Sequence, residues 1–151
     1  RHDYPALPDR RSPSAREAAW SSYLGVLEHF QAAGKRTVLV LSAPELPAPM
    51  DYMMRRTPDS EGRIAGVSRD WWEARRAWLM ARLDEVPRGV IIVDPTGLFC
   101  DAATCYAAEG ETGLYFDQNH ASIYGMDRIA EAIIAAAPPG REETGRAPTG
   151  E

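Results

Sequence analysis

The stretch Val90-Ile91-Ile92-Val93-Asp94-Pro95 decides the fold class. It begins as a short apolar run without alternation, which is typical of a parallel strand that is buried on both faces. Thr37-Val38-Leu39-Val40-Leu41 is a second run of this kind, and helical patterns lie before, between and after the two runs. The order helix, strand, helix, strand, helix predicts part of a doubly wound, three-layer α/β/α sandwich with a parallel sheet.

The helical segments carry clear start signals. Ser12 and Pro13 are an N-cap and a first helical residue, Ser14 and Glu17 form an overlapping capping box, and Gly34 suits the C′ position, so a helix is expected over about residues 13 to 33. A second helix should begin near Ser68 and continue through an apolar stripe of Trp71, Trp72, Trp78, Leu79, Leu83 and Val86. A last helix is expected over about residues 122 to 137, with Ile123, Met126, Ile129, Ile133 and Ile134 on its buried side.

Two strands do not complete such a sandwich, because a two-stranded parallel sheet cannot bury both faces and leaves two open edges. We therefore expect residues 1–137 to be the C-terminal portion of a longer fold whose first strands are absent. The opening Arg1-His2-Asp3-Tyr4-Pro5 fits a loop that follows a missing strand. Residues 138–151 are only Pro, Gly, charged, Thr and Ala residues, a composition that predicts a disordered tail.

Composition limits the possible functions. The 151 residues are 44% hydrophobic and 26% charged, which suits one globular domain or part of one. A net charge of −5 without a basic stripe argues against a nucleic-acid partner. No apolar run has the length of a membrane span, and no signal segment opens the chain, so any targeting element is expected outside it.

The candidate chemistry lies in the segment Tyr115-Phe116-Asp117-Gln118-Asn119-His120-Ala121-Ser122, with Gly125 just beyond it. Asp117 and His120 are three residues apart at the start of a predicted helix. On one tight turn the carboxylate can bind one ring nitrogen while the other nitrogen serves as a general base toward a hydroxyl nucleophile. The alternative is a capped helix start with a solvated histidine, which the residue types alone would favour.

The surrounding motifs resemble the SGNH/GDSL hydrolase superfamily, and within it the SGNH domain at the C-terminus of membrane acyltransferase-3 proteins. In that group a strand ending in Val-Asp-Pro leads into a Cys-containing loop and then a Tyr-x-Asp-x-x-His-Leu-Ser-x-x-Gly block. Here Ala121 replaces the usual Leu. The Ala43-Pro44-Glu45-Leu46-Pro47 loop also resembles that group, so the similarity covers roughly residues 13 to 137.

The resemblance implies a serine ester mechanism without metal or organic cofactor, in which His120 is the base and Asp117 orients it. The family's serine lies in a Gly-Asp-Ser block, which does not occur in this sequence. Ser42 follows an apolar run but is itself followed by Ala43-Pro44, and Pro has no N–H for an oxyanion, so Ser42 makes a poor nucleophile. The serine is expected outside this chain, which alone should be inactive and fold poorly.

The two cysteines, Cys100 and Cys105, are five positions apart in a polar loop. Their spacing is too wide for a Cys-x-x-Cys redox motif, and two thiols are too few for a zinc site. A disulfide is the preferred interpretation, and two free thiols are the alternative. Pairing would indicate an extracytoplasmic location.

The sequence thus predicts the C-terminal part of an extracytoplasmic O-acyltransferase or esterase, tethered to the membrane through missing N-terminal sequence. Its expected partners are an acylated glycan or acyl donor, with O-acetyl the expected acyl group, and a membrane acyltransferase domain in the same longer chain. The alternative is a non-catalytic glycan-binding or structural module that has lost the serine, with Trp71 and Trp72 as sugar contacts. An apolar helix face is usually core, so we expect the tryptophans to be buried.

Overall fold

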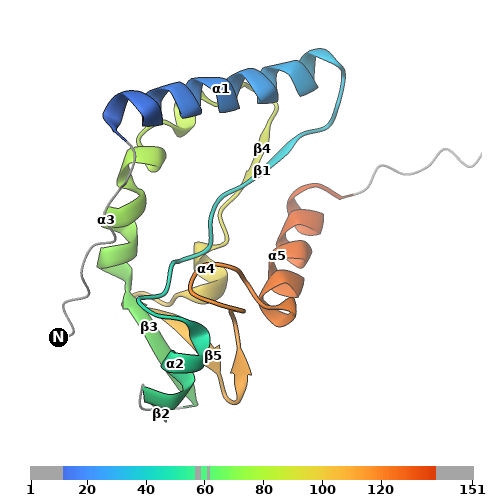
Figure 1. Cartoon of the computed structure of the whole chain (residues 1–151). Helices are drawn as coiled ribbons and strands as arrows, with labels where there is room; N and C mark the ends of the chain where they lie inside the picture. Colours follow the sequence, from blue (N-terminus) through green and yellow to red (C-terminus); the bar gives the residue numbers. More distant parts are fainter. Residues whose placement is uncertain (1–11, 57–58, 61, 139–151) are drawn as a thin grey trace, which may run out of the picture.

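The computed structural model describes residues 12–56, 59–60 and 62–138 (Figure 1). The elements in chain order are α1 (Pro13–Ala32), β1 (Val38–Val40), α2 (Met50–Arg56), β2 (Asp59–Ser60), β3 (Arg63–Ser68), α3 (Arg69–Met80), the 3-10 turn η1 (Leu83–Glu85), β4 (Ile91–Val93), α4 (Thr96–Phe99), β5 (Thr104–Glu109), β6 (Thr112–Gly113) and α5 (Ile123–Ala136). The expected loop at residues 1–5 and most of the expected tail lie outside the described residues.

The helix starts are where the sequence predicts them, because each N-cap serine accepts a hydrogen bond from a backbone N–H of the first turn. Ser12 Oγ accepts from the N–H of Ala15 at 3.2 Å, and Ser68 Oγ accepts from that of Trp71 at 3.2 Å. Ser122 Oγ accepts from Gly125 N–H at 3.1 Å. Gly34 follows α1 with a φ of 68°, the left-handed conformation that ends a helix.

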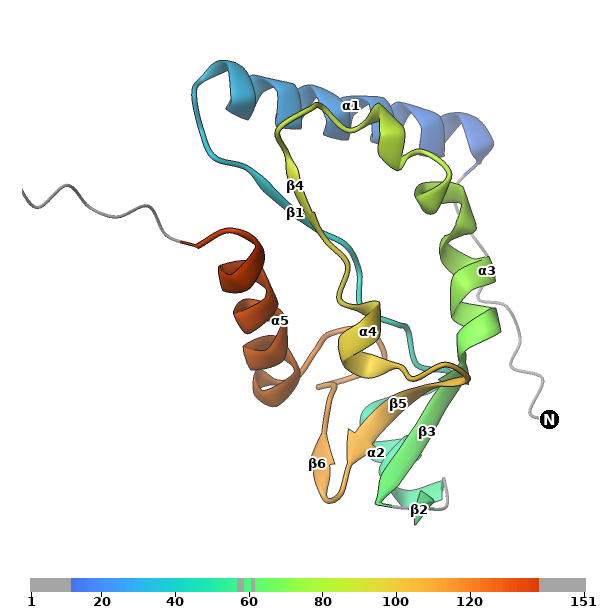
Figure 2. The same ribbon diagram turned by 180° about the vertical axis from the view of Figure 1, so that it is seen from behind.

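The predicted α/β fold with a parallel strand pair is confirmed. β1 and β4 run parallel, with Val38 opposite Ile91 and Val40 opposite Val93. Trp20 and Leu27 of α1 pack with Leu39 of β1 in one apolar cluster. α5 contacts β4, and Figures 1 and 2 show the two strands between α1 and α5.

The strands are less buried than expected. Val40 is 36% exposed and Ile92 is 38% exposed, although the sequence predicts burial on both faces. Ile92 is paired with Leu39, so these two side chains point to the same face of the sheet. Val40 follows Leu39 and points to the other face, so each face has one exposed apolar residue. The helices described here therefore cover only part of either face.

A second sheet, which the sequence analysis did not predict, occupies the lower part of Figure 2. Its strands are antiparallel in the order β2-β3-β5-β6. β2 and β3 lie where only a loop was expected before the second helix, and β5 and β6 follow β4, where the Cys-containing loop was expected. β3 and β5 form its centre, with Arg63 opposite Glu109 and Ser68 opposite Thr104. A Cβ on Gly66 would be only 2.7 Å from the Leu46 side chain, so glycine is what allows the loop after β1 to pack on β3.

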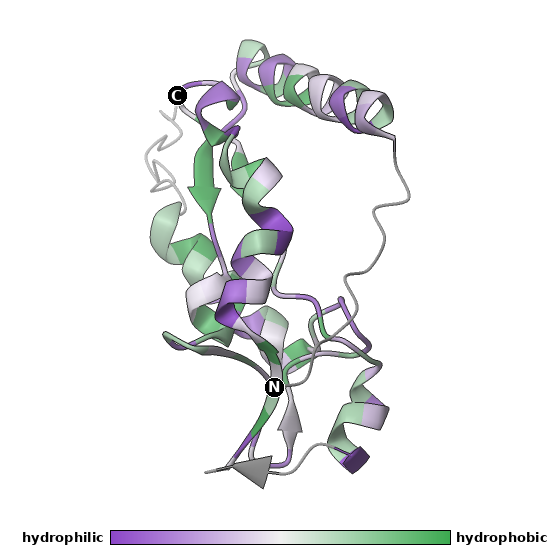
Figure 3. Ribbon diagram, turned by 90° about the vertical axis from the view of Figure 1, so that its left-hand side faces the viewer, coloured by the Kyte–Doolittle hydropathy of each residue, from purple (hydrophilic) through white to green (hydrophobic). Residues whose placement is uncertain are grey.

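Two expected apolar stripes need correction. The helix from Ser68 ends at Met80, so Leu83 lies in the 3-10 turn and Val86 follows it, although Val86 is still buried. On α5, Ile129 is buried and Ile133 packs beside it, but Ile123, Met126 and Ile134 are exposed. α5 packs against the rest of the chain along one narrow side, while Figure 3 shows hydrophobic residues along most of its length. None of the described helices is long and apolar enough to cross a membrane.

Candidate active site

Residues 114–122 form a turn that is closed at its neck by backbone hydrogen bonds. The N–H of Phe116 donates to the carbonyl of His120 at 2.7 Å, and the N–H of Ser122 donates to that of Leu114 at 3.0 Å. Tyr115 and Ala121 are paired across the neck. The N–H of Leu114 continues the pairing to the carbonyl of Ala107 in β5, so the turn is an extension of the antiparallel sheet.

The structure brings the predicted acid and base together at the tip of this turn. Nδ1 of His120 lies 2.7 Å from Oδ2 of Asp117. The other carboxylate oxygen accepts the backbone N–H groups of Asn119 at 2.9 Å and His120 at 2.8 Å. These backbone bonds fix the carboxylate, and the carboxylate in turn sets the orientation of the imidazole. The His120 side chain is 74% exposed, which leaves it accessible to a group outside the turn.

The electrostatics keep Asp117 ionised. The N–H of Asn119, the imidazole and the N–H of His120 all stabilise the carboxylate and lower the pKa of Asp117 to about 2. A carboxylate that stays charged at neutral pH can stabilise an imidazolium beside it. The pair is therefore suited to a histidine that takes up a proton and releases it again.

The turn is held from below by the packing of Tyr115 and Gly125. Tyr115 is buried and its ring lies 5.3 Å from that of Phe99. Burial raises the pKa of the Tyr115 hydroxyl, which makes this tyrosine a packing residue rather than an acid or base. A Cβ on Gly125 would be 2.3 Å from the carbonyl oxygen of Leu114, so only glycine lets α5 start this close to the turn.

The loop after β1 also contacts the turn. The N–H of Leu46 donates to the carbonyl of Gln118 at 2.7 Å, and the Leu46 side chain is fully buried. This bond ties the tip of the turn to the segment that leaves the carboxyl end of β1. Ligands of parallel α/β sheets bind at that end.

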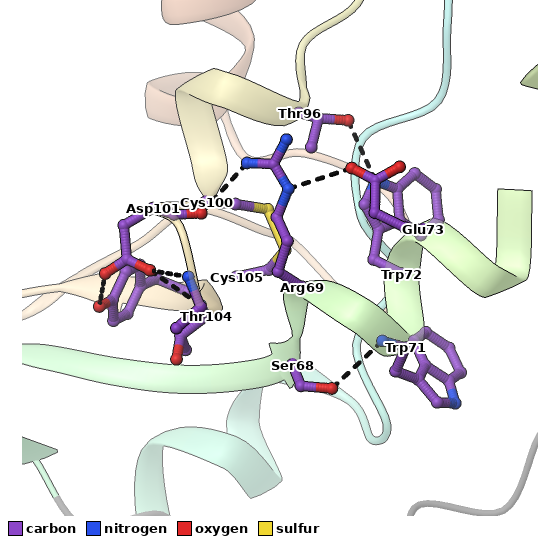
Figure 4. The surroundings of a disulfide bond; sticks show 12 residues. Ser68, Arg69, Trp71, Trp72, Glu73, Thr96, Cys100, Asp101, Thr104 and Cys105 are labelled. Carbon is purple, nitrogen blue, oxygen red and sulfur yellow. Dashed lines mark hydrogen bonds and ion pairs between the residues drawn. A yellow bond between two sulfur atoms is a disulfide. The ribbon is translucent and has the colours of Figure 1, made fainter.

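The structure joins Cys100 to Cys105 by a disulfide, the preferred sequence interpretation (Figure 4). The bond connects the end of α4 to β5, the strand that receives Leu114. The loop between the cysteines is ordered by Asp101, whose carboxylate accepts the N–H groups of Ala103 and Thr104, each at 2.8 Å. The disulfide therefore holds together two supports of the turn, namely Phe99 and β5.

A polar network that the sequence analysis missed fixes the Asp-Pro end of β4. Arg76 of α3 donates to Oδ2 of Asp94 at 2.6 Å and to Oγ1 of Thr96 at 2.8 Å. The indole N–H of Trp72 donates to the same Thr96 oxygen at 3.0 Å, and Glu73 forms an ion pair with Arg76. Burial alone would raise the pKa of Asp94, but the bonds from Thr96 and Arg76 lower it. The motif Val-Asp-Pro thus anchors α4 to α3.

The tryptophans favour the core interpretation over the sugar-platform alternative. Trp72 is buried in a cluster with Val67 and Cys105, and Trp71 packs partly against this cluster. Trp78 is half-buried against Leu39 and Leu41. A side chain as enclosed as Trp72 cannot present a face to a glycan, so a Trp71–Trp72 platform does not exist in this structure.

No described serine has the features of a nucleophile beside this pair. The Ser122 hydroxyl donates to the carbonyl of Gly113 at 2.7 Å and caps α5, so it has a structural role. Ser42 lies at the end of β1, where it lines a cavity with Trp78 and Leu79. Over residues 12–56, 59–60 and 62–138, no three His, Cys, Asp or Glu side chains are grouped as they would be to bind a metal ion.

The α/β fold has an Asp–His pair on the turn before its last helix, an arrangement that suits the base of a hydrolase. The chain belongs to the family of SGNH domains that are fused to AT3 domains, whose model matches residues 2–135. It is also similar to an acetylesterase from Thermothelomyces thermophilus, with 26% identity over 140 residues, or 85% of this chain and 46% of that relative. The chain therefore spans about half the length of this curated relative. No solved structure matches the chain.

Proposed function

We propose that this chain is the C-terminal part of an SGNH domain that hydrolyses or transfers O-acyl esters, with O-acetyl groups of cell-surface glycans as the substrates. The observation that carries the proposal is the 2.7 Å contact between Nδ1 of His120 and Asp117 on an exposed turn. Membership of the SGNH family and the similarity to an acetylesterase support ester chemistry.

In this mechanism Nδ1 is occupied by Asp117, so Nε2 of His120 is the nitrogen that acts on the nucleophile. Nε2 takes the proton of a serine hydroxyl as the serine oxygen attacks the ester carbonyl. The same nitrogen then donates that proton to the leaving alcohol oxygen as the acyl carbon–oxygen bond breaks. Water or an acceptor alcohol completes hydrolysis or transfer by the reverse proton path. Asp117 remains ionised throughout and stabilises the imidazolium.

We place the serine in upstream sequence that completes the parallel sheet. Among the described strands, β1 pairs only with β4, so its other edge has no described partner. A cavity of about 430 Å³ adjoins β1 and is lined by α1, β1 and α3, including Trp20, Leu39 and Trp78. An added strand on this edge would fill an apolar space and bring its carboxyl end to the same side as the Asp117–His120 turn.

The proposal includes the cellular location of the domain and its attachment to the membrane. A disulfide is stable in an oxidising compartment, so the domain would act outside the cytoplasm. The matching family consists of domains fused to AT3 domains, which supports a membrane acyltransferase domain in the same longer chain as acyl donor and tether.

The test is a histidine substitution in a chain extended to include the upstream sequence. His120→Ala should lower kcat for an activated acetyl ester by about 10³-fold or more. Asp117→Asn should cost less, because an amide oxygen can still accept the two backbone N–H groups and keep the turn folded. His29→Ala is the matched control, since His29 is an exposed histidine on α1. Full turnover by the His120→Ala variant would exclude the proposed function.

A further inference from the structure

Phe116 is an exposed aromatic residue on the same side of the turn as the proposed catalytic base. The bridge between Tyr115 and Ala121 and the bond from Phe116 N–H to the His120 carbonyl make Phe116 and His120 opposite neighbours. Successive side chains of an extended chain point to opposite sides. Tyr115 points into the core, so Phe116 and His120 point outward, in agreement with exposures of 81% and 74%.

The position of Phe116 indicates that it contacts the substrate rather than another part of the protein. Opposite residues of an antiparallel pair have Cβ atoms about 5 Å apart, so a molecule that reacts at the imidazole is within reach of the Phe116 side chain. The turn is bonded through Gln118 to the segment that leaves the carboxyl end of β1. Added strands cover the edges of a parallel sheet, whereas its carboxyl end is the side open to ligands. Phe116 therefore lies where substrate enters, unlike the exposed Val40 and Ile92.

The chemistry of the proposed reaction distinguishes the two ends of the ester. His120 donates its proton to the alcohol oxygen as the acyl carbon–oxygen bond breaks, and the acyl group stays on the serine. The alcohol oxygen must then lie about 3 Å from the imidazole nitrogen. The carbonyl oxygen of the ester instead points to the oxyanion donors. These donors need not come from the turn that carries His120. The alcohol moiety is thus the part of the ester nearest Phe116.

We propose that Phe116 is a specificity-determining residue that stacks on the C–H face of a sugar ring in the alcohol moiety. This inference rests on the proposed function and adds the side of the substrate that the turn recognises. A flat, rigid aromatic side chain provides a large apolar contact at low entropic cost, which suits the alternating C–H face of a pyranose. A small aliphatic alcohol offers no such face.

The experiment uses the chain extended upstream and compares kcat/KM for three esters: an acetylated methyl glucopyranoside, its butyrylated analogue, and ethyl acetate. Phe116→Ala should lower kcat/KM for the acetylated glycoside by about tenfold. It should leave the value for ethyl acetate within about twofold, and leave the acetyl-to-butyryl ratio unchanged. Phe116→Trp keeps an aromatic face and should retain most of the activity on the glycoside. Ile134→Ala is the control, because Ile134 is an exposed apolar residue near the end of α5, and it should change none of the three values.

Equal losses on the glycoside and ethyl acetate, no loss on the glycoside, or a changed acetyl-to-butyryl ratio would each overturn the assignment of Phe116. These results are separate from a failure of the proposed function. That failure would be full turnover by the His120→Ala variant, or no turnover of any ester by the unsubstituted extended chain.

Discussion

The half of the molecule around β3, β5 and the Asp117–His120 turn is closed, whereas the half around β1 and β4 is open. In the closed half Phe99, Leu114 and Cys105 are almost completely buried, and a disulfide joins two of its segments. In the open half Val40 and Ile92 of the strands are exposed, as are Tyr23, Val26 and Phe30 of α1.

The difference indicates that the proposed catalytic residues come from two parts of the longer protein. The acid–base pair is assembled by local contacts that this chain supplies by itself, through backbone bonds to Ala107 and Leu46 and the close approach of Gly125. The parallel pair instead presents exposed apolar residues and a strand edge without a described partner, which the proposed upstream segment would cover. We infer that the base is preassembled here and that the nucleophile comes with the segment that closes the open half.

The largest effect on stability is expected from Gly125→Ala, which would disrupt the packing of α5 against the turn in the closed half. Its Cβ would clash with the Leu114 carbonyl, a backbone atom that cannot move without separating α5 from the turn. We expect a loss of about 3 kcal/mol in the free energy of unfolding of the extended chain, together with lower esterase activity. Gly25→Ala is the control: nothing lies within 4 Å of its Cβ position, and alanine in mid-helix should add about 0.5–1 kcal/mol. Equal midpoints of urea unfolding for the two variants would contradict this account.

The next effect concerns the disulfide. Replacing both Cys100 and Cys105 by serine should lower the unfolding free energy by about 2 kcal/mol in the loop-entropy model. Thiol labelling of denatured, unreduced protein from an oxidising compartment should find neither sulfur reactive. Labelling of both sulfurs under those conditions would contradict the pairing and the oxidising location that we derive from it.

A smaller effect on stability tests whether the open half is covered in the longer chain. Val40→Thr keeps the shape of the side chain but replaces one methyl group by a hydroxyl. If upstream strands bury Val40, the substitution should cost the extended chain about 1 kcal/mol, because a buried hydroxyl loses its hydration. A surface position would lose less than about 0.5 kcal/mol. A thermal unfolding midpoint that does not change would indicate that Val40 stays exposed in the longer chain.

The smallest effect is confined to low pH and to the loop beside the disulfide. The Tyr106 hydroxyl and the N–H groups of Ala103 and Thr104 lower the pKa of Asp101 from 3.8 to about 2. Ionised Asp101 therefore favours the folded state above about pH 4, and this contribution disappears as the pH falls through about 2. Asp101→Asn should flatten the dependence of the urea midpoint on pH between pH 4 and pH 2. An unchanged slope would show that Asp101 is not a source of acid sensitivity.

The sequence predicted the closed turn better than the sheet beneath it. Asp117, His120 and the capping Ser122 act through neighbours three residues away, so their spacing in the chain reveals their geometry. β3 and β5 were missed because Ala65, Gly66 and Ala107 give weak strand signals. Gly66 packs closely on the Leu46 side chain and Ala107 is buried in the same cluster as Leu46, which are contacts that a local sequence pattern does not show.

The exposure of the apolar residues on one side of α5 also could not be predicted from the sequence pattern. Helical spacing groups Ile123, Met126 and Ile134 with the apolar residues of this helix, but it does not show whether another element packs on them. In the structure all three are exposed. Phe116 carried no helical or strand periodicity at all. Its position became informative only when the bond between its N–H and the His120 carbonyl placed it beside the base.

The most direct test of the divided machinery is an acetyl ester assay on this chain and on one extended upstream by about 50–90 residues, the length that a complete domain of typical size requires. The 151-residue chain should be inactive, because it lacks the Gly-Asp-Ser block. The longer chain should be active, and its activity should be lost when the serine of its Gly-Asp-Ser block is replaced by alanine or when His120 is. Serine-dependent turnover by the short chain alone would contradict the account and would direct attention to Ser42 or Ser122.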